Sequence, residues 1–511
     1  MFKAKPMASH FIDMRTYLSF FFVCICLSSS AQVDDFRKTY DEFRNQAQQE
    51  YEDFRKKANE EYAEFMRKTW ENHKTLPAKP KPIEKDVPPV VIKDEEKKRP
   101  IEDTPVIIEE EIDIPAPTPQ PKPISPIKEK EGESDRLAFA LYGTKMSVRL
   151  VPSQKIKLAK LDINEIAKTW DVLSSDDYNN VIRDCLELRI KHQLCDWAYL
   201  RMIDKLSSSF LGEGTNEAEL FKAFLYCQSG YQMRLAMANN HLYMLYASQH
   251  FMFDKPCWKI DEIFYYADNC DAEQIQICEA SFPHEQAMSL YVPNEQNLDP
   301  IKSANRTLQS EDVDWLRVDV SENENIIKFC DEYPTSCIGD NFMTRWAMYA
   351  NMPLSNSTKE QLYPQFKAFF DAVKRSFEED STDMRNYAPA CVDLICHWIQ
   401  TAFVYEYDDK VWGADRAFFA DETLYYPYCD CEDRSILLTR MVRDLLGLKC
   451  ALVYYPGHLA TAIAIGEDVK GDFIRINGTK FLVCDPTYIG APIGMTMPGM
   501  DNQSAKVIVL N

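Results

Sequence analysis

A thiol, an imidazole and a carboxylate follow one another in three short motifs near the C-terminus. Cys431 lies in CDCEDRS, His458 in YPGHLATAIAIG and Asp485 in FLVCDPTY. A thiolate can attack a carbonyl carbon, an imidazole can take and return the proton, and a carboxylate can orient the imidazole. Each of these residue types is common in cores and turns. Their order in the chain is what favours an acyl-transfer site.

The segments that carry these residues predict a helix followed by antiparallel strands. Apolar residues recur at helical spacing after Cys431 as far as Leu446, and Gly447 ends the helix. KCALVYYP, LATAIAIG, DFIRING and KFLVCDPTY then alternate with turn residues, as antiparallel strands do. Cys431 would therefore begin a helix, where free N–H groups and the helix dipole favour a thiolate. His458 and Asp485 would lie on neighbouring strands.

The oxyanion of such a reaction needs hydrogen-bond donors. The backbone N–H of Cys431 is a natural first donor, because it would point out of the helix start. Trp398 and Gln400, in the helical segment 358–407, are candidates for the second donor.

These motifs resemble the transglutaminase-like superfamily, whose fold is similar to that of papain-type cysteine peptidases. In that family a Cys-x-Asp heads a helix that ends in Leu-Gly, a His begins a strand, and an Asp-Pro-Thr ends a later strand. The matching residues here are Cys431-Glu432-Asp433, Leu446-Gly447, His458 and Asp485-Pro486-Thr487. The chain departs from the pattern at Cys429, where the family often has Gly, and at Leu459, where an aromatic residue often follows the His. The second departure puts the shape of the acyl pocket in doubt.

The resemblance implies an α+β, papain-like domain in which the helix bearing the Cys packs on an antiparallel sheet. It implies Cys431 as nucleophile, His458 as acid and base, and Asp485 as the orienting carboxylate. Family members include cross-linking acyltransferases, peptidases, amidases and inactive scaffolds. The expected activity is therefore acyl transfer or hydrolysis at amide bonds of peptides or proteins through a thioester, with no cofactor and no metal. An inactive scaffold stays open, as does a metal site built from Cys429, Cys431, His458 and Asp485.

The spacing of the glycine, the histidine and the aspartate in these motifs occurs a second time upstream. A shift of 217 residues aligns Gly447 with Gly230, His458 with His241 and Asp485 with Asp268, but places Gly214 where Cys431 stands. Glycine carries no nucleophile, so the upstream copy is expected to be degenerate, with Gly214, His241 and Asp268 as its inactive site.

Composition and patterning divide the chain into six regions. A net charge of −22 argues against nucleic acid or an anionic membrane surface as the main partner. The regions are a signal peptide (1–31), an amphipathic helix (32–73), a Pro-rich linker (74–135), a degenerate transglutaminase-like domain (136–278), a mixed connecting region (279–357) and a catalytic transglutaminase-like domain (358–511).

The signal peptide rests on Arg15 followed by the apolar run YLSFFFVCICL and by SSSAQ, which is too short to span a bilayer. It predicts export to the periplasm or the extracellular space, with no membrane span after cleavage. An oxidising location permits disulfides, and Cys330/Cys337 or Cys270/Cys278 are plausible pairs.

Two further segments have distinctive patterns. Tyr-x-x-Phe recurs every 11 residues from Tyr40 to Phe65, which predicts a long amphipathic helix, and self-association through residues 33–73 is a hypothesis. Residues 74–135 hold thirteen prolines among many charges and predict an extended, disordered linker without a core. VDWLRVDV and NIIKFCDEY in the connecting region suggest strands around a turn.

Overall fold

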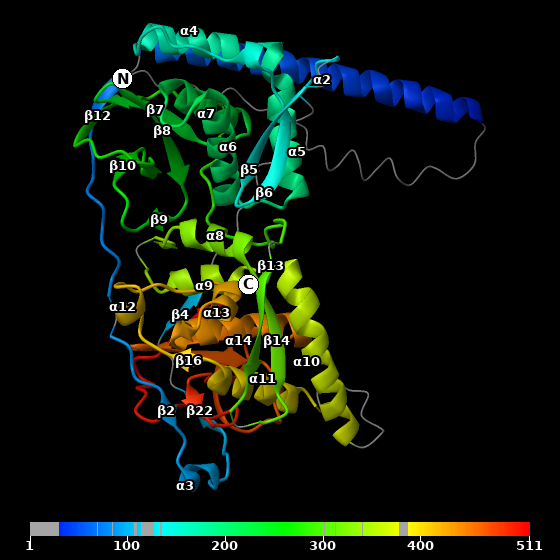
Figure 1. The fold of residues 1–511 in the computed structure, drawn as a ribbon, viewed down its shortest axis with the longest axis vertical. Helices are drawn as coiled ribbons and strands as arrows, with labels where there is room; N and C mark the ends of the chain where they lie inside the picture. The colour runs from blue at the N-terminus through cyan, green and yellow to red at the C-terminus, as the bar shows by residue number, and fades with distance from the viewer. Residues whose placement is uncertain are drawn as a thin grey trace.

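The computed structural model describes residues 30–68, 70–83, 85–106, 110–113, 127–132, 135–283, 285–300, 302–311, 313–339, 341–377 and 387–510. The protein is a mixed α+β molecule with two main sheets, one in each half of the body (Figure 1). The predicted signal peptide lies outside the described residues except for Ser30 and Ala31, which begin the first helix. None of the described helices combines the length and apolar character that a bilayer-spanning helix needs.

The N-terminal half, in the upper part of Figure 1, is built from helices packed on one sheet. Its elements are α2 (Ser30–Met66), β1 (Trp70–Lys74), β5 (Arg136–Leu141), β6 (Thr144–Arg149), α4 (Ile163–Leu173), α5 (Asn179–Lys191), α6 (Asp196–Leu211), α7 (Asn216–Gln228), β7 (Met233–Ala238), β8 (His241–Ser248), β9 (Phe251–Met252), β10 (Cys257–Ile260), β11 (Ile263–Tyr266) and β12 (Gln274–Cys278).

The C-terminal half contains the predicted catalytic region. Its elements are β13 (Lys302–Gln309), β14 (Arg317–Asn323), α8 (Glu324–Glu332), β15 (Ser336–Cys337), α9 (Thr344–Asn351), α10 (Asn356–Ser376), α11 (Ala388–Ala402), β16 (Val404–Tyr405), α12 (Asp408–Val411), α13 (Ala420–Tyr425), β17 (Tyr428–Cys429), α14 (Cys431–Leu446), β18 (Cys450–Tyr455), β19 (His458–Ile463), β20 (Asp472–Ile476), β21 (Thr479–Cys484), β22 (Tyr488–Ile489) and β23 (Lys506–Val509). The expectation of strands in NIIKFCDEY is wrong, because this segment forms α8, whose apolar residues Ile326, Ile327 and Phe329 are buried at helical spacing.

The two main sheets share one strand order. The first runs β12-β7-β8-β11-β10 and the second β23-β18-β19-β21-β20, with added strands at their edges. Helices α7 and α14 precede equivalent hairpins and contact the second strand of each. The hairpins pair in the same register, since Ala238 faces His241 in one and Tyr455 faces His458 in the other. The 217-residue spacing of the sequence therefore coincides with a repeated helix–hairpin unit, although β12 and β23 themselves do not follow that spacing.

The strand pair after the hairpin is β8–β11 in the first sheet and β19–β21 in the second. The pairing register of these two strand pairs differs by one residue. Ile463 on β19 pairs with Leu482, whose counterpart under the 217-residue shift is Tyr265. Tyr246, the counterpart of Ile463, pairs instead with Tyr266. A slip of one residue moves side chains to the opposite face of a strand. The alignment of Asp268 with Asp485 in sequence is therefore not an alignment in the sheet.

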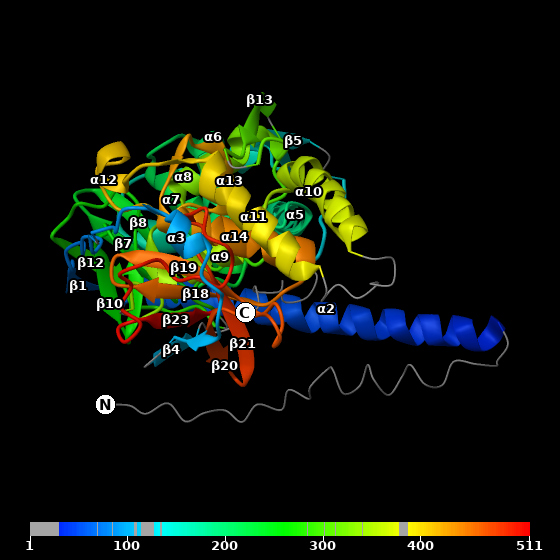
Figure 2. The same cartoon turned by 90° about the horizontal axis from the view of Figure 1, so that it is seen from below.

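Helix α2 confirms the amphipathic prediction, but the predicted end at residue 73 is wrong. The helix stops at Met66, and residues 70–74 form β1, which pairs antiparallel with β12 at the edge of the first sheet. The C-terminal part of α2 packs on α4, where the rings of Tyr62 and Trp170 have centroids 4.9 Å apart. The N-terminal part extends beyond the body (Figure 2), and Tyr40 and Phe43 on it are exposed. Phe54 and Phe65, farther along α2, are exposed as well.

The prediction of a disordered linker over residues 74–135 is wrong for much of its length. Strands β2 (Val90–Val91), β3 (Thr104–Pro105) and β4 (Glu110–Asp113) pair with β22, β20 and β23, and α3 (Asp94–Lys97) lies between the first two. We call the described residues between 75 and 113 the strap. It runs from the first sheet along one side of the molecule to the second sheet (Figure 1).

The strap is ordered because apolar residues lie between its prolines. Ile92, Val106 and Ile112 are buried against the C-terminal half. Proline is tolerated there because the strap strands occupy sheet edges, where a missing N–H leaves no neighbouring strand unpaired. The composition of this segment predicted a solvated spacer. Burial of its apolar residues against the C-terminal half orders it instead.

The expected disulfides are absent from the described part of the chain. All fourteen cysteines from Cys185 to Cys484 have free thiols and are buried. The pairs Cys330/Cys337 and Cys270/Cys278 are therefore wrong. These side chains act as small apolar groups in the core.

We expect the two halves of the α2 aromatic stripe to differ in their contribution to stability. Tyr62→Ala should lower the free energy of unfolding by about 3 kcal/mol or more, because a buried ring leaves a cavity. Phe43→Ala, at a side chain that is 62% exposed, should change it by less than about 0.5 kcal/mol. Urea unfolding of the two variants followed by circular dichroism measures both values, and equal losses would contradict the docking of α2.

Candidate active site

Cys431 is the first residue of α14, as the sequence predicted. Asp430 precedes it in an extended conformation, and Gly447 ends the helix with a φ of 66°, a left-handed conformation that suits glycine. The hydroxyl of Ser435, one turn into the helix, donates to the Leu459 carbonyl on β19 over 2.9 Å. This bond ties the start of the helix to the start of the strand that carries His458.

His458 and Asp485 form a buried hydrogen-bonded pair. Nε2 of His458 lies 2.8 Å from Oδ2 of Asp485, and both side chains are almost fully excluded from solvent. The second carboxylate oxygen of Asp485 accepts the backbone N–H of Thr487 over 2.8 Å, which holds the carboxylate in place. Nδ1 of His458 is buried and has no hydrogen-bond partner among the described residues. With Nε2–H donated to Asp485, Nδ1 is left as a proton acceptor.

The sulfur of Cys431 faces the same small cavity as His458. The backbone N–H of Leu459 interacts with the sulfur. Cys431 and His458 both line a space of about 10 Å³, which is the room that one water molecule needs. Glycine at position 457 is needed beside this space, because a Cβ there would stand 2.5 Å from the Lys85 carbonyl oxygen of the strap.

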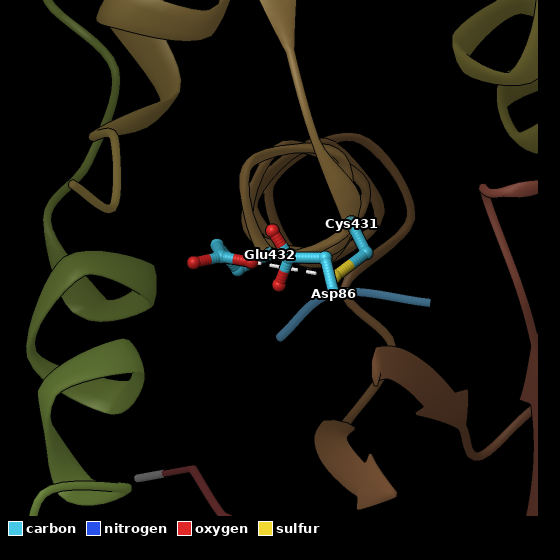
Figure 3. A group of neighbouring side chains, drawn as sticks. All are labelled: Asp86, Cys431 and Glu432. Carbon is cyan, nitrogen blue, oxygen red and sulfur yellow. Dashed lines mark hydrogen bonds between the residues drawn. The ribbon is translucent and has the colours of Figure 1, made fainter. Parts of the chain in front are cut away.

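Acidic side chains surround the thiol and keep it protonated. The Cys431 thiol donates to Oε2 of Glu432 over 3.3 Å, and the side chains of Asp86 and Glu432 lie beside the sulfur (Figure 3). Burial first, and then the charges of Glu432, Asp430 and Asp86, raise the pKa of Cys431 well above its usual value. The resting site is therefore closed, with a neutral thiol.

The strap closes this cavity from outside. The backbone N–H of Val87 donates to the Gly457 carbonyl over 2.8 Å, and Asp86 lines the cavity beside Cys431. Nothing in the sequence pointed to Asp86, which belongs to a segment expected to be disordered. Residues 85–87 therefore lie against Gly457 and beside the cavity of the Cys431 sulfur.

Both predicted oxyanion donors are in the wrong place. The amide nitrogen of Gln400 donates to the backbone carbonyls of Asp485 and Ala491 over 3.0 and 3.1 Å. Trp398 is buried in the core, and its indole N–H is 3.4 Å from the Leu308 carbonyl. Gln400 therefore positions the turn that carries Asp485, and Trp398 packs the helix.

Trp346 on α9 is the indole that sequence analysis missed. It lines the cavity with Cys431 and His458, and its Nε1–H is buried without a hydrogen-bond partner in the described part of the protein. Its ring stacks on Tyr454, with centroids 5.5 Å apart. An unsatisfied buried donor is costly, and such a donor beside a nucleophile suits an oxyanion. Only the tertiary fold brings α9 to this place.

A chain of buried carboxylates lies behind the thiol. The described groups whose ligand atoms approach within 4.8 Å of one another are Asp86–Cys431–Glu432, Asp408–Asp415–Glu432 and Asp408–Asp430–Asp433. None of these groups contains Cys429, His458 or Asp485, so the predicted Cys/His/Asp metal set does not converge. Cys429 instead accepts from Nε of Arg434 over 3.4 Å, and burial raises its pKa to about 11.

The three carboxylates of Asp408, Asp430 and Asp433 repel one another strongly if all are ionised. At a separation of 4.8 Å each pair would cost at least about 3.5 kcal/mol. The dipole of α14 offsets only about 1 kcal/mol per charge. Burial and this repulsion raise the pKa of Asp408 to about 8 and the pKa values of Asp430 and Asp433 well above their usual range.

The upstream residues do not form an equivalent site. Gly214 lies in the loop before α7, and His241 is exposed at the start of β8. Asp268 binds Arg201 and Lys255 over 2.5 and 3.3 Å, and these cations lower its pKa. The one-residue slip of β11 and this ion pairing give Asp268 a structural role in the N-terminal half.

Comparisons with known proteins identify no relative. A scan against protein-family models gives no match, and neither do searches of curated proteins and of solved structures. The chemistry of the site must therefore be argued from its own geometry.

We expect Asp86→Asn to make Cys431 more reactive. Removing a negative charge beside the thiol lowers its pKa, so more thiolate is present at any pH below that pKa. The rate of iodoacetamide labelling at pH 8 should rise about threefold to tenfold. Mass spectrometry of the peptide containing Cys431, fragmented to separate it from Cys429, measures this rate.

Asp94→Asn is the matched control, because Asp94 lies in the same strap on the exposed helix α3. It should label as the unsubstituted protein does. An unchanged rate in Asp86→Asn would show that the Asp86 charge does not control the thiol.

Proposed function

We propose that the protein is a cysteine enzyme of transglutaminase-like, papain-like type. In this proposal it cleaves or transfers an acyl group at amide bonds of peptides or proteins. The observation that carries the proposal is the state of His458. One ring nitrogen is held by Asp485 at 2.8 Å. The other has no partner among the described residues, and His458 lines the cavity of the Cys431 sulfur.

In the proposed reaction, Nδ1 of His458 takes the proton of the Cys431 thiol as the sulfur attacks the amide carbon. The C–N bond of the tetrahedral intermediate breaks, and the imidazolium returns the proton to the leaving amine. A thioester remains on Cys431. Water or a second amine then attacks the thioester carbon and loses its proton to His458. The C–S bond breaks, the acyl group leaves on the attacking oxygen or nitrogen, and the imidazolium returns the proton to the sulfur.

The oxyanion of each tetrahedral intermediate would be held by two N–H groups. The backbone N–H of Cys431 has no partner within the helix, because it belongs to the first residue of α14. The indole N–H of Trp346 is the second donor. Both groups are fixed by the fold before substrate binds, which is the condition for strong stabilisation of developing charge.

The order of elements supports the family proposal, with a thiol at a helix start, a histidine at the start of a strand and an aspartate just after a later strand. The N-terminal half would then be a degenerate copy that has kept the helix–hairpin unit for packing. Export to the periplasm or the extracellular space, with a peptide or protein substrate, is part of the same proposal.

A non-catalytic scaffold is the second candidate, favoured by the closed cavity and the protonated thiol. The two candidates differ in one respect that can be measured. An enzyme needs His458 to raise the reactivity of Cys431, whereas a buried structural thiol does not.

We expect His458→Ala, made in the Asp86→Asn background, to lower the labelling rate of Cys431 at pH 7 by at least about tenfold. His241→Ala in the same background is the matched control, since His241 holds the equivalent register position in the upstream sheet. It should leave the rate unchanged. Equal rates in both variants would favour the scaffold.

We expect Trp346→Phe to lower kcat about 100-fold with little change in KM, because the lost N–H acts on the oxyanion and not on bound substrate. Ammonia release from glutamine-containing peptides, with and without an added primary amine, measures turnover and separates hydrolysis from transamidation. Trp315→Phe, at an exposed tryptophan, is the control. Equal loss of kcat in both variants would refute the oxyanion role.

A further inference from the structure

Three carboxylates from two structural segments meet behind the helix start that carries Cys431. Asp408 begins α12, Asp430 directly precedes α14, and Asp433 lies in its first turn. One oxygen from each lies within 4.8 Å of the others, and all three residues are buried. None of them belongs to the proposed triad.

Asp430 is the member that lacks partners. Neither of its carboxylate oxygens has a hydrogen bond within the described structure, although the residue is fully excluded from solvent. An aspartate at this position normally accepts an N–H from the first helical turn, but this side chain makes no such bond. Buried carboxylates without partners are rare in folded proteins. One of its oxygens nevertheless lies within 4.8 Å of an oxygen of Asp408 and of Asp433.

The other two carboxylates are held in place by backbone donors. Asp433 accepts the N–H groups of Phe418 and Asp430 over 2.8 and 3.3 Å. Asp408 accepts the N–H of Arg416 over 2.5 Å. These bonds orient the carboxylates and leave further lone pairs on their oxygens.

Nearby guanidinium groups have partners elsewhere. Arg345 binds Asp415 over 3.0 Å, and Arg416 binds Asp331 and Glu422, both over 2.7 Å. Arg434 donates to the backbone carbonyls of Gln400 and Phe403. No ion pair between these arginines and the three-carboxylate cluster is found among the described residues.

We propose that Asp408, Asp430 and Asp433 bind one divalent metal ion of the hard, oxygen-preferring class, with Ca²⁺ as the best fit. Three carboxylates offer up to six oxygens, the lower end of the calcium coordination range, and water can add more. The absence of sulfur and nitrogen from the set disfavours zinc. Calcium also tolerates the irregular geometry that two separate segments impose better than magnesium does.

The ion would tie the α12 segment to the start of α14. Asp430 is adjacent to Cys431, so the ion would also fix the backbone that leads into the nucleophile. The proposal does not depend on the catalytic function, because a scaffold with the same helix start would bind the same ion.

Calorimetric titration of the full chain with CaCl2, after removal of metals by a chelator, tests the proposal. We expect one ion per chain, and at least tenfold weaker binding in Asp430→Asn and in Asp408→Asn. Asp409→Asn, at the exposed neighbour of Asp408, is the matched control and should bind as the unsubstituted protein does. Absence of calcium binding, or binding that is unchanged in Asp430→Asn, would overturn the proposal.

Thermal unfolding provides a second readout that separates a ligand role from a packing role. CaCl2 at 100 times the dissociation constant should raise the Tm of the unsubstituted protein by about 3 °C. Without metal, Asp430→Asn should unfold at the same or a higher temperature, because a buried carboxyl group without hydrogen-bond partners among the described residues has been replaced, and calcium should no longer raise its Tm. A lower Tm without metal together with an undiminished calcium effect would overturn the proposal.

A parallel titration with ZnCl2 distinguishes the neighbouring set Asp86–Cys431–Glu432. Zinc binding that is tighter than calcium binding, lost in Cys431→Ala and kept in Asp430→Asn, would assign the ion to that set and overturn the proposed one. Zinc binding weaker than calcium binding supports the oxygen-only site.

Discussion

The attachment of the first turns of α14 to β19 is the interaction on which the candidate site depends. Ser435 donates to the Leu459 carbonyl over 2.9 Å, and Thr461 donates back to the Ser435 carbonyl over 3.2 Å. These two bonds lock a helix onto a strand through groups that are themselves buried, where a lost partner is costly. The thiol at one end of the helix and the imidazole at one end of the strand are thereby held against the same cavity. Asp485 reaches the imidazole because β21 is the next strand of the sheet.

Electrostatics works against the thiolate in this resting arrangement. A helix start favours negative charge, but its contribution is small beside that of the closely packed carboxylates. Burial, and then the charges of Glu432, Asp430 and Asp86, keep the Cys431 thiol neutral, and the cavity beside it has room for a single water. Reactivity would therefore depend on moving the strap or balancing the charge. Asp86 belongs both to the strap and to the charged groups around the thiol.

The repeated helix–hairpin unit carries the candidate site in one copy and an ion-paired aspartate in the other. Both copies keep the strand order and the first hairpin register. They differ at the residue that begins the helix and by one residue in the next strand pair. That slip separates Asp268 from the role of Asp485, and Arg201 then binds it. A histidine in the right register is thus not enough to make a site, which the exposed position of His241 illustrates.

Local pattern in the sequence determined the helix that begins at Cys431, its end at Gly447, the run of strands after it, and the adjacency of His458 and Asp485. These features follow from hydrophobic period and turn residues, which act over short distances. The sequence did not determine the strap, Asp86, Trp346, the acidic cluster or the true role of Gln400. Those depend on contacts between segments far apart in the chain, and only packing decides which of them form. Proline-rich composition predicted disorder for the strap because composition records the conformational stiffness of a segment. It does not record the sheet edge that the strap occupies.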